Sequence, residues 1–280
     1  MTHTWDPERY LAYADERGRP FVDLISRIDV PLGDRGGRSG DRHEIRTVVD
    51  LGCGPGNLTA LLAERWPDAA VTGVDSSAEM IAAARDRIGG VRFEVGDLRD
   101  WGLYTPSPSG PGCSTTEEGG VDVLVSNATL QWLPDHLELL PRLVAQVRPG
   151  GWLAFQVPGN FDEPSHTIRT ELAAEHPYAD HAADVAVPSS YDPMTYLRAL
   201  QRLGCEVDAW ETTYLHVLHG EDPVFTWVSG TGARPTLQAL PDDLRPGFEQ
   251  EFKRRLRDAY PDDGHGAVLP FRRIFVVARR

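Results

Sequence analysis

The sequence TVVDLGCGPGN, residues 47–57, decides the fold. Its first five residues form a short apolar run that predicts a buried β-strand, and the glycine-rich segment Gly52–Gly56 follows at once. Beyond the glycines, apolar side chains recur at helical spacing and end at a proline: Leu58, Leu61, Leu62, Trp66 and Pro67. We therefore predict a strand, a tight turn and a helix whose N-cap is Asn57.

The same alternation continues along the chain. Residues 71–75 predict a second strand, and Ser76-Ser77-Ala78-Glu79 has the spacing of a capping box before a helix that ends at Gly89-Gly90. Further strands are expected at residues 91–95, 121–125 and 152–157, with a helix at 136–147 before the last of them. Because strands alternate with helices, we expect right-handed crossovers and a parallel sheet.

The two ends of the chain are less regular. A helical pattern at residues 10–28 precedes a loop at 33–44, and a second loop-like segment covers residues 104–120. In the C-terminal part we expect a helix from Asp192-Pro193 to about Leu203, a strand at 205–218, a charged helix at 242–260 and a closing apolar strand at 273–278.

The composition excludes several function classes. The 280 residues are 41% hydrophobic, which is enough for a packed core. A net charge of −14 argues against binding to nucleic acid or to an anionic membrane, both of which require clustered Lys and Arg. There is no signal-peptide pattern, no apolar run near the ~20 residues of a membrane span, and the three cysteines suggest neither a disulfide nor a metal site. We expect a cytoplasmic monomer.

The glycine-rich segment also indicates a kind of ligand. In an open α/β sheet, ligands bind beyond the carboxyl ends of the strands, where this segment lies. The dinucleotide fingerprint is G-x-G-x-x-G, whereas the spacing here is G-x-G-x-G, and Asp50 stands two residues before the first glycine. A carboxylate repels a pyrophosphate and attracts a cationic, phosphate-free ligand. S-adenosyl-L-methionine, with an ammonium, a sulfonium and a ribose, fits this charge; the alternative is a turn that binds no ligand.

Polar residues follow the other strands as well. Asp75 comes 19 positions after Gly56 (75 − 56), close to the ~20-residue spacing at which an acid accepts hydrogen bonds from ribose hydroxyls. Asp97 follows the third strand and is a candidate to hold an adenine amino group, and Asn127 follows the fourth. We expect these side chains to converge on one edge of the sheet.

These features resemble the class I S-adenosylmethionine-dependent methyltransferases over residues 48–157. Asp50–Gly56 is similar to their glycine-rich first motif, Asp75 to their ribose-binding acid, Asp97-Leu98 to their adenine-contacting pair, and Pro149-Gly150-Gly151 to the turn before the fifth strand. The cofactor-binding candidates are Asp50, Gly52, Cys53, Gly54, Gly56, Asp75, Ser76, Met80, Asp97, Leu98, Asn127 and Tyr10.

The resemblance implies an α/β, Rossmann-like fold with a seven-stranded, mostly parallel sheet, helices on both faces, an N-terminal helical lid and C-terminal helical insertions. All 280 residues would form one methyltransferase domain. Residues 1–44 would form an N-terminal cap and loop, residues 45–158 the cofactor-binding core, and residues 159–280 the substrate-side insertions and closing strands.

A narrower resemblance, to the trans-aconitate methyltransferases, extends over almost the whole chain. It is carried by Trp5-Asp6-Pro7, Asp50–Asn57, Asp75-Ser76-Ser77, Asn127–His136, Glu163–His166, Gly204–Asp208, Thr231–Pro235 and Val276–Arg280. It implies methylation of one carboxylate of trans-aconitate, a small anionic substrate, to give a monomethyl ester and S-adenosylhomocysteine. The segment 104–120 is a longer insertion than this family leads one to expect.

A carboxylate acceptor has a pKa near ~4 and is already ionised at neutral pH, so we expect no catalytic general base. Proximity and removal of water would then drive the reaction. Residues 5–19 are a candidate lid; the alternative is a helix packed against the sheet. A trianion requires cations, and the substrate-binding candidates are Arg17, Arg19, Trp132, His166, Arg234 and Arg273, although Trp132 is equally suited to a core position and Cys53 better suited to packing than to reactivity.

Three alternatives remain open on the residues alone. A small-molecule O- or N-methyltransferase of secondary metabolism would share the cofactor site and differ in the acceptor pocket. A non-catalytic module would bind the cofactor for regulation. A nicotinamide-dependent oxidoreductase would share the fold, but the glycine spacing argues against it.

Overall fold

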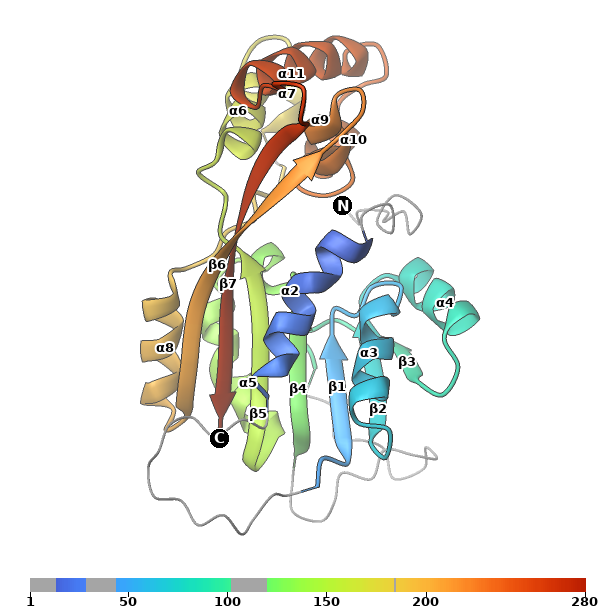
Figure 1. The fold of residues 1–280 in the computed structure, drawn as a ribbon, viewed down its shortest axis with the longest axis vertical. Helices are drawn as coiled ribbons and strands as arrows, with labels where there is room; N and C mark the ends of the chain where they lie inside the picture. Colours follow the sequence, from blue (N-terminus) through green and yellow to red (C-terminus); the bar gives the residue numbers. More distant parts are fainter. Residues whose placement is uncertain (1–13, 29–43, 102–119, 184) are drawn as a thin grey trace.

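The computed structural model describes residues 14–28, 44–101, 120–183 and 185–280, and the structural statements below concern these residues. A seven-stranded sheet lies at the centre, in the order β3-β2-β1-β4-β5-β7-β6 (Figure 1). Its strands are β1 (Thr47–Leu51), β2 (Ala70–Asp75), β3 (Arg92–Val95), β4 (Val121–Asn127), β5 (Val147–Pro158), β6 (Glu206–Leu218) and β7 (Ala267–Arg279). Within this sheet β7 alone runs antiparallel to its neighbours, so the predicted mostly parallel sheet is confirmed.

Helices cover both faces of the sheet, as expected. One face carries α2 (Ala14–Ser26), α3 (Asn57–Arg65) and α4 (Ala78–Arg87), and the other carries α5 (Leu140–Gln146) and α8 (Pro193–Arg202). Neighbouring residues of β1 belong to different cores: Val48 clusters with Phe21 and Leu58, and Val49 clusters with Leu143. None of the helices in the described chain is long and apolar enough to cross a membrane.

The strands β6 and β7 extend past the sheet as a two-stranded ribbon. They pair from Glu206–Arg279 to Leu218–Ala267, whereas β5 pairs only with Arg273–Arg279 of β7. The ribbon leads to a layer of helices that stands above the carboxyl ends of the parallel strands (Figure 1). This helical layer consists of α6 (Pro164–Ala173), α7 (Ala179–Ala182), α9 (Pro223–Ser229), α10 (Arg234–Ala239) and α11 (Arg245–Ala259).

The helical layer has an apolar core of its own. On α11, Phe248, Phe252 and Leu256 recur every four residues and are buried. They cluster with Trp227 of α9 and Phe271 of the ribbon. This core fixes the helices to the ribbon, and the predicted C-terminal helical insertions are confirmed.

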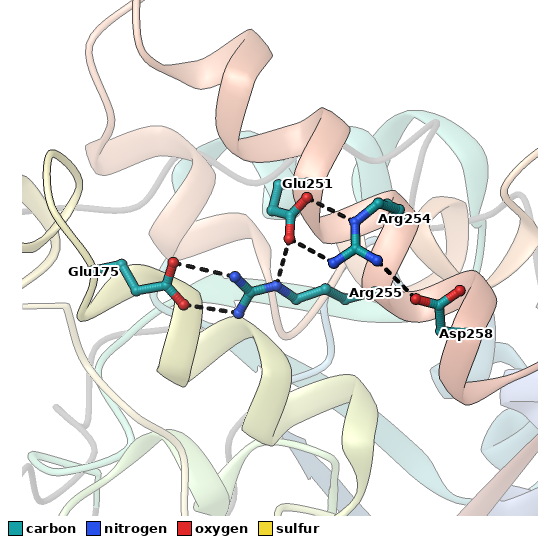
Figure 2. Close-up of polar contacts among 5 residues, drawn as sticks. All are labelled: Glu175, Glu251, Arg254, Arg255 and Asp258. Carbon is teal, nitrogen blue, oxygen red and sulfur yellow. Dashed lines mark hydrogen bonds and ion pairs between the residues drawn. The ribbon is translucent and has the colours of Figure 1, made fainter.

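An ion-pair network lies on the surface of the layer (Figure 2). Arg255 donates to Glu175 at 2.8 and 3.1 Å and to Glu251 at 2.8 Å. Arg254 donates to Glu251 and, at 2.8 Å, to Asp258. The two arginines lower the pKa of Glu251 to about 2. The network joins α11 to the segment that follows α6, although exposed ion pairs contribute little to stability.

Several local predictions were wrong. Gly56, not Asn57, is the N-cap of α3, because the turn into the helix has a φ of 80°. Ser77 rather than Ser76 caps α4, and its hydroxyl accepts a hydrogen bond from the Met80 N–H at 3.2 Å. The helix expected at 136–147 is a 3-10 turn, η2 (His136–Leu139), followed by α5. The closing strand begins at Ala267, earlier than predicted, because the ribbon continues it beyond the sheet.

The predicted lid, residues 5–19, lies largely outside the described residues, and Tyr10 lies outside them too. The described side chains of α2 pack on the sheet. Phe21 and Leu24 are fully buried in the core that contains Val48. For this part of the helix, packing against the sheet is therefore the observed arrangement.

Candidate active site

The glycine-rich loop leads from the carboxyl end of β1 into α3. Gly52 has a φ of 80°, and a Cβ atom there would collide with the side chain of Thr129, which follows β4. Glycine alone accommodates both that backbone conformation and that close approach. The contact brings the ends of β1 and β4 together at one site.

The backbone N–H groups of this loop are already hydrogen-bonded within the protein. Those of Gly52 and Cys53 donate to the Val74 carbonyl at 2.7 and 3.1 Å. That of Gly54 donates to Asp75 Oδ2 at 2.9 Å. Phosphate-binding loops instead present their N–H groups to the ligand. The loop is therefore unsuited to a pyrophosphate, and a dinucleotide is a poorer fit than a phosphate-free nucleoside.

Asp75, at the end of β2, is held rigidly. Its Oδ2 accepts from Gly54 N–H at 2.9 Å and its Oδ1 from Ser77 N–H at 2.8 Å. Burial raises its pKa, and these two N–H groups lower it in part. Each carboxylate oxygen can accept a further hydrogen bond. A fixed carboxylate with spare acceptor sites suits the two hydroxyls of a ribose.

Asp50 is buried in β1, behind the loop. Its Oδ2 accepts from the Thr59 hydroxyl at 2.7 Å, while its Oδ1 has no hydrogen-bond partner in the described structure. Burial raises the pKa of Asp50 to about 7; the Thr59 hydrogen bond opposes this shift and the charge of Asp75 adds to it. A cation bound close by would favour the ionised form, so the site is electrostatically suited to a positive ligand.

A cavity opens at these strand ends, and we call it the strand-end cavity. Eight of the predicted cofactor-binding residues line it: Gly52, Gly54, Asp75, Ser76, Met80, Asp97, Leu98 and Asn127. Asp50, Cys53 and Gly56 do not line the cavity, and the first two are buried. Cys53 packs against Ile81 and Phe93, and burial raises the pKa of its thiol, which suits the predicted packing role.

Asp97 forms an ion pair with Arg99, two residues further along the chain. The Arg99 guanidinium contacts both carboxylate oxygens, with Nε 3.0 Å from Oδ1 and Nη2 2.5 Å from Oδ2, and lowers the pKa of Asp97. Arg99 also lines the strand-end cavity, and it was not among the residues predicted for the site. Its position two residues after Asp97 was the one feature of the sequence that could have placed Arg99 at the cavity. This side of the cavity is therefore close to neutral, whereas the side near Asp50 and Asp75 is acidic.

The segment after β4 is held in place by buried hydrogen bonds. Gln131 donates from Nε2 to the Ala128 carbonyl at 2.5 Å. His136 lies with Nδ1 3.1 Å from the Leu133 carbonyl and Nε2 2.7 Å from the Tyr196 hydroxyl. Because a carbonyl only accepts, Nδ1 carries the proton and Nε2 accepts from Tyr196. These contacts fix the 3-10 turn η1 (Leu130–Trp132) beside the cavity.

A second cavity lies between the sheet and the helical layer, and we call it the interlayer cavity. It is lined by Asn127, Ala128, Gln131, Trp132, Pro158, Phe161, His166, Pro188, Trp227, Val228, Thr231, Gly232, Phe271 and Arg273. Asn127, Ala128 and Trp132 line both cavities. A ligand in one cavity therefore lies next to a ligand in the other at this point.

Arg273 is a buried cation in the wall of the interlayer cavity. Its guanidinium carbon lies 4.3 Å from the centroid of the Phe271 ring, and Nη1 donates to Gln156 Oε1 at 3.4 Å. Gln156 in turn donates from Nε2 to Asn127 Oδ1 at 2.7 Å. A hydrogen-bonded chain thus connects the cation to the residue shared by the two cavities.

His166 lines the same cavity, where its surroundings disfavour the protonated imidazole. Burial, together with the charge of Arg169, lowers its pKa to about 4, so the imidazole is neutral at pH 7. Arg169, one helical turn further along α6 and only 3% exposed, carries the charge instead. Arg169 was not among the predicted residues. Once the buried face of α6 is known, however, a charged residue on that face stands out as unusual.

The residues predicted to bind substrate divide between the interlayer cavity and positions away from both cavities. Trp132, His166 and Arg273 line the interlayer cavity, whereas Arg19 and Arg234 line neither cavity. Arg19 is exposed on α2, with its guanidinium carbon 5.3 Å from the centroid of the Tyr214 ring. The side chain of Arg17 lies outside the described part of the chain. Of the predicted arginines whose side chains the structure describes, Arg273 lines the interlayer cavity and the other two line neither cavity.

Comparison with known proteins agrees with this geometry. Residues 10–209 match a family model described as a methyltransferase domain. The solved structure of geranyl diphosphate C-methyltransferase from Streptomyces coelicolor A3(2), determined with Mg²⁺, geranyl diphosphate and S-adenosyl-L-homocysteine, shares the fold with a TM-score of 0.50 at 17% identity, over 98% of this chain and 86% of that one. The fold and the strand-end cavity thus define a methyltransferase.

Closer relatives narrow the class. The chain is 46% identical to the trans-aconitate 2-methyltransferase of Streptomyces avermitilis, over 99% of this chain and 97% of the relative. It is 48% identical to the protein of the same name from Rhodococcus jostii, over 98% and 99%. The chain belongs to the family of the trans-aconitate 2-methyltransferases.

Proposed function

We propose that this chain transfers the methyl group of S-adenosylmethionine to one carboxylate of trans-aconitate, producing a monomethyl ester and S-adenosylhomocysteine. The observation that carries the proposal is that two cavities of different character share Asn127, Ala128 and Trp132. The strand-end cavity is acidic and unsuited to phosphate groups, whereas the interlayer cavity has the buried cation Arg273 in its wall. The names of relatives at 44–48% identity support the same pair of ligands.

The residues of the strand-end cavity fit the methyl donor. Asp75 would hold the ribose hydroxyls with its spare acceptor sites, and Asp50 would supply negative charge near the cationic end. Asp97-Leu98 would lie at the adenine. When bound, S-adenosylmethionine supplies a methyl group on a positively charged sulfur, which makes the methyl carbon open to displacement.

The interlayer cavity would bind and orient the acceptor. A carboxylate with a pKa near ~4 needs no proton removed at neutral pH, so no residue is required as a general base. Arg273 would fix one carboxylate of the acid, and the apolar side chains of Trp132, Phe161 and Trp227 would exclude water from another. A carboxylate that has lost its water is a stronger nucleophile, and orientation contributes the rest of the rate.

We further propose that the chain acts as a cytoplasmic monomer with no nucleic-acid or membrane partner, as one domain over residues 1–280. The charge of −14 disfavours binding to nucleic acid or to an anionic membrane, and the free, buried thiols of Cys53 and Cys205 suit a reducing compartment. Sedimentation of the purified chain at micromolar concentration tests the oligomeric state: a single species of about the 30.9 kDa chain mass is expected, and a dimer contradicts it.

The experiment for the reaction uses S-adenosylmethionine labelled in its methyl group, with trans-aconitate, cis-aconitate, isocitrate and citrate as acceptors. We expect base-labile labelled ester to form fastest on trans-aconitate, and an Asp75→Ala variant to give none above background. Labelling of an uncharged hydroxyl or amine acceptor, with none of these acids, would instead support a small-molecule O- or N-methyltransferase. Cofactor binding without turnover on any acceptor would indicate a non-catalytic module.

A further inference from the structure

Arg169 is a buried cation whose hydrogen bonds within the described chain all go to neutral groups. On α6 it belongs to the buried face with Ser165, His166 and Leu172. It donates to the Gly232 carbonyl and, at 3.2 Å, to the Thr170 hydroxyl. No carboxylate of the described chain forms an ion pair with it. Burial lowers its pKa. An unpaired buried charge is costly, so its retention calls for a counter-charge from elsewhere.

Arg169 contacts the lining of the interlayer cavity at Gly232. Gly232, whose carbonyl Arg169 holds, lies so close to His166 that a Cβ atom there would be 2.8 Å from Cε1 of the ring. The imidazole also meets the Phe161 ring edge-on, at 5.2 Å between centroids. Gly232, His166 and Phe161 all line the cavity. The guanidinium therefore contacts this wall through the Gly232 carbonyl, although Arg169 is not itself part of the cavity lining.

Two cations therefore lie at the cavity on different elements: one lines it, and the other contacts a residue that lines it. Arg273 reaches the wall from β7, at the sheet, and Arg169 contacts it from α6, in the helical layer. An acceptor with a single carboxylate would need only one of them. A polycarboxylate would place negative charge near both, and it would neutralise the charge that the described chain leaves unpaired on Arg169.

Resting on the proposed function, we propose that Arg169 is a positioning residue for the acceptor, which holds the Gly232–His166 wall and selects acids with several carboxylates. It acts through the wall and through its charge, not by taking part in the displacement. Its loss should therefore weaken binding of the acceptor and leave binding of the methyl donor and the turnover of bound acceptor nearly unchanged.

The test compares Arg169→Met with Arg169→Lys and with a control, Arg245→Met. Arg245 also donates to backbone carbonyls of the helical layer, those of Leu237 and Leu240 at 2.8 and 3.0 Å, but it lines neither cavity. Each variant is assayed with acceptors that bear three, two or one carboxylate on a similar carbon skeleton. Binding of S-adenosylhomocysteine is measured by calorimetry, and folding by thermal unfolding.

For Arg169→Met we expect the KM for trans-aconitate to rise roughly 10- to 100-fold, as for loss of a charge-assisted interaction, and the rise to shrink with each carboxylate removed from the acceptor. Arg169→Lys should recover part of the loss. The kcat and the Kd for S-adenosylhomocysteine should stay within about threefold. Arg245→Met should lower the unfolding temperature without altering any KM.

Two results would overturn the inference while the proposed function stands: an unchanged KM in Arg169→Met, or an equal loss for acceptors of every charge, which is the mark of a structural role. The proposed function fails separately if the wild-type protein neither binds nor methylates trans-aconitate, and the inference then fails with it.

Discussion

The strand-end cavity and the interlayer cavity are assembled from the chain in different ways. The first takes nearly all its residues from short segments that directly follow β1, β2, β3 and β4. The second gathers residues from the end of β4, the segment after β5, α6, α9, the turn before α10 and β7. Local sequence order fixes the first, whereas the second depends on the packing of the helical layer.

This difference should make specificity for the methyl donor independent of specificity for the acceptor. A parallel sheet brings its carboxyl ends together whatever lies above it, so the proposed donor site is a property of the sheet. The proposed acceptor site exists only because the β6–β7 ribbon carries a second apolar core above the sheet. A change in one cavity should therefore affect one ligand, except at Asn127, Ala128 and Trp132, which line both.

The largest expected effect comes from Gly52→Ala. The new Cβ would collide with Thr129 and would require a φ of 80° that alanine disfavours, so the loop must shift. We expect affinity for S-adenosylhomocysteine, measured by calorimetry, to fall by roughly 100-fold or more. Gly90→Ala is the matched control: its φ is 77° but its Cβ would meet nothing within 4 Å. If both variants bind the ligand like the wild type, the loop does not form the donor site.

The second-largest effect is expected from Asp50→Asn, which should stabilise the ligand-free protein and weaken binding of the methyl donor. Asp50→Asn should keep the Thr59 hydrogen bond while removing the charge, and affinity for S-adenosylmethionine should fall roughly 10-fold or more at pH 8. In the ligand-free protein the same change should raise the free energy of unfolding by roughly 1–3 kcal/mol at pH 8.

The sign follows from the pKa of Asp50, about 7 in the folded protein against 3.8 when exposed. Ionising this group costs folded stability as the pH rises from about 4 through 7, so the advantage of asparagine should disappear at pH 4 and below. Denaturant unfolding at several pH values measures this. A variant that is less stable than the wild type at pH 8 and equally good at binding the donor would contradict the assignment of Asp50.

Gly232→Ala should produce a smaller effect, restricted to the acceptor. Its Cβ would press on the His166 ring at 2.8 Å and displace part of the interlayer wall. We expect the KM for trans-aconitate to rise roughly 10-fold with an unchanged Kd for S-adenosylhomocysteine. Gly89→Ala, where a Cβ would meet nothing within 4 Å, is the control. Equal weakening of both ligands would show that the two cavities are not energetically separate.

The smallest effect is expected from Arg255→Ala, which removes the contacts to Glu175 and Glu251 on the surface of the helical layer. Because these side chains are partly exposed, the unfolding temperature should fall by no more than about 3 °C, and less in 1 M salt. Neither KM should change. A large rise in the acceptor KM would mean that this network, rather than the apolar core, positions the interlayer wall.

The sheet and most of the lining of the strand-end cavity could be predicted from the sequence, because their signals are local. The order of strands, glycines and acids along the chain is enough to place Asp75, Asp97 and Asn127 at one edge of the sheet. The acceptor side was only partly predictable. Arg273 and His166, predicted to bind substrate, do line the interlayer cavity, whereas Arg19 and Arg234 line neither cavity. Arg169 was not predicted, because its contact with Gly232 depends on how α6 packs against the turn there.

The most direct measurement is a crystal structure with S-adenosylhomocysteine and trans-aconitate bound together. We expect the nucleoside in the strand-end cavity with its ribose on Asp75. The acid should lie in the interlayer cavity with one carboxylate beside Asn127 and Trp132, directed at the sulfur, and another on the side of Arg273. An acid bound outside the interlayer cavity, or a nucleoside away from Asp75, would contradict this arrangement.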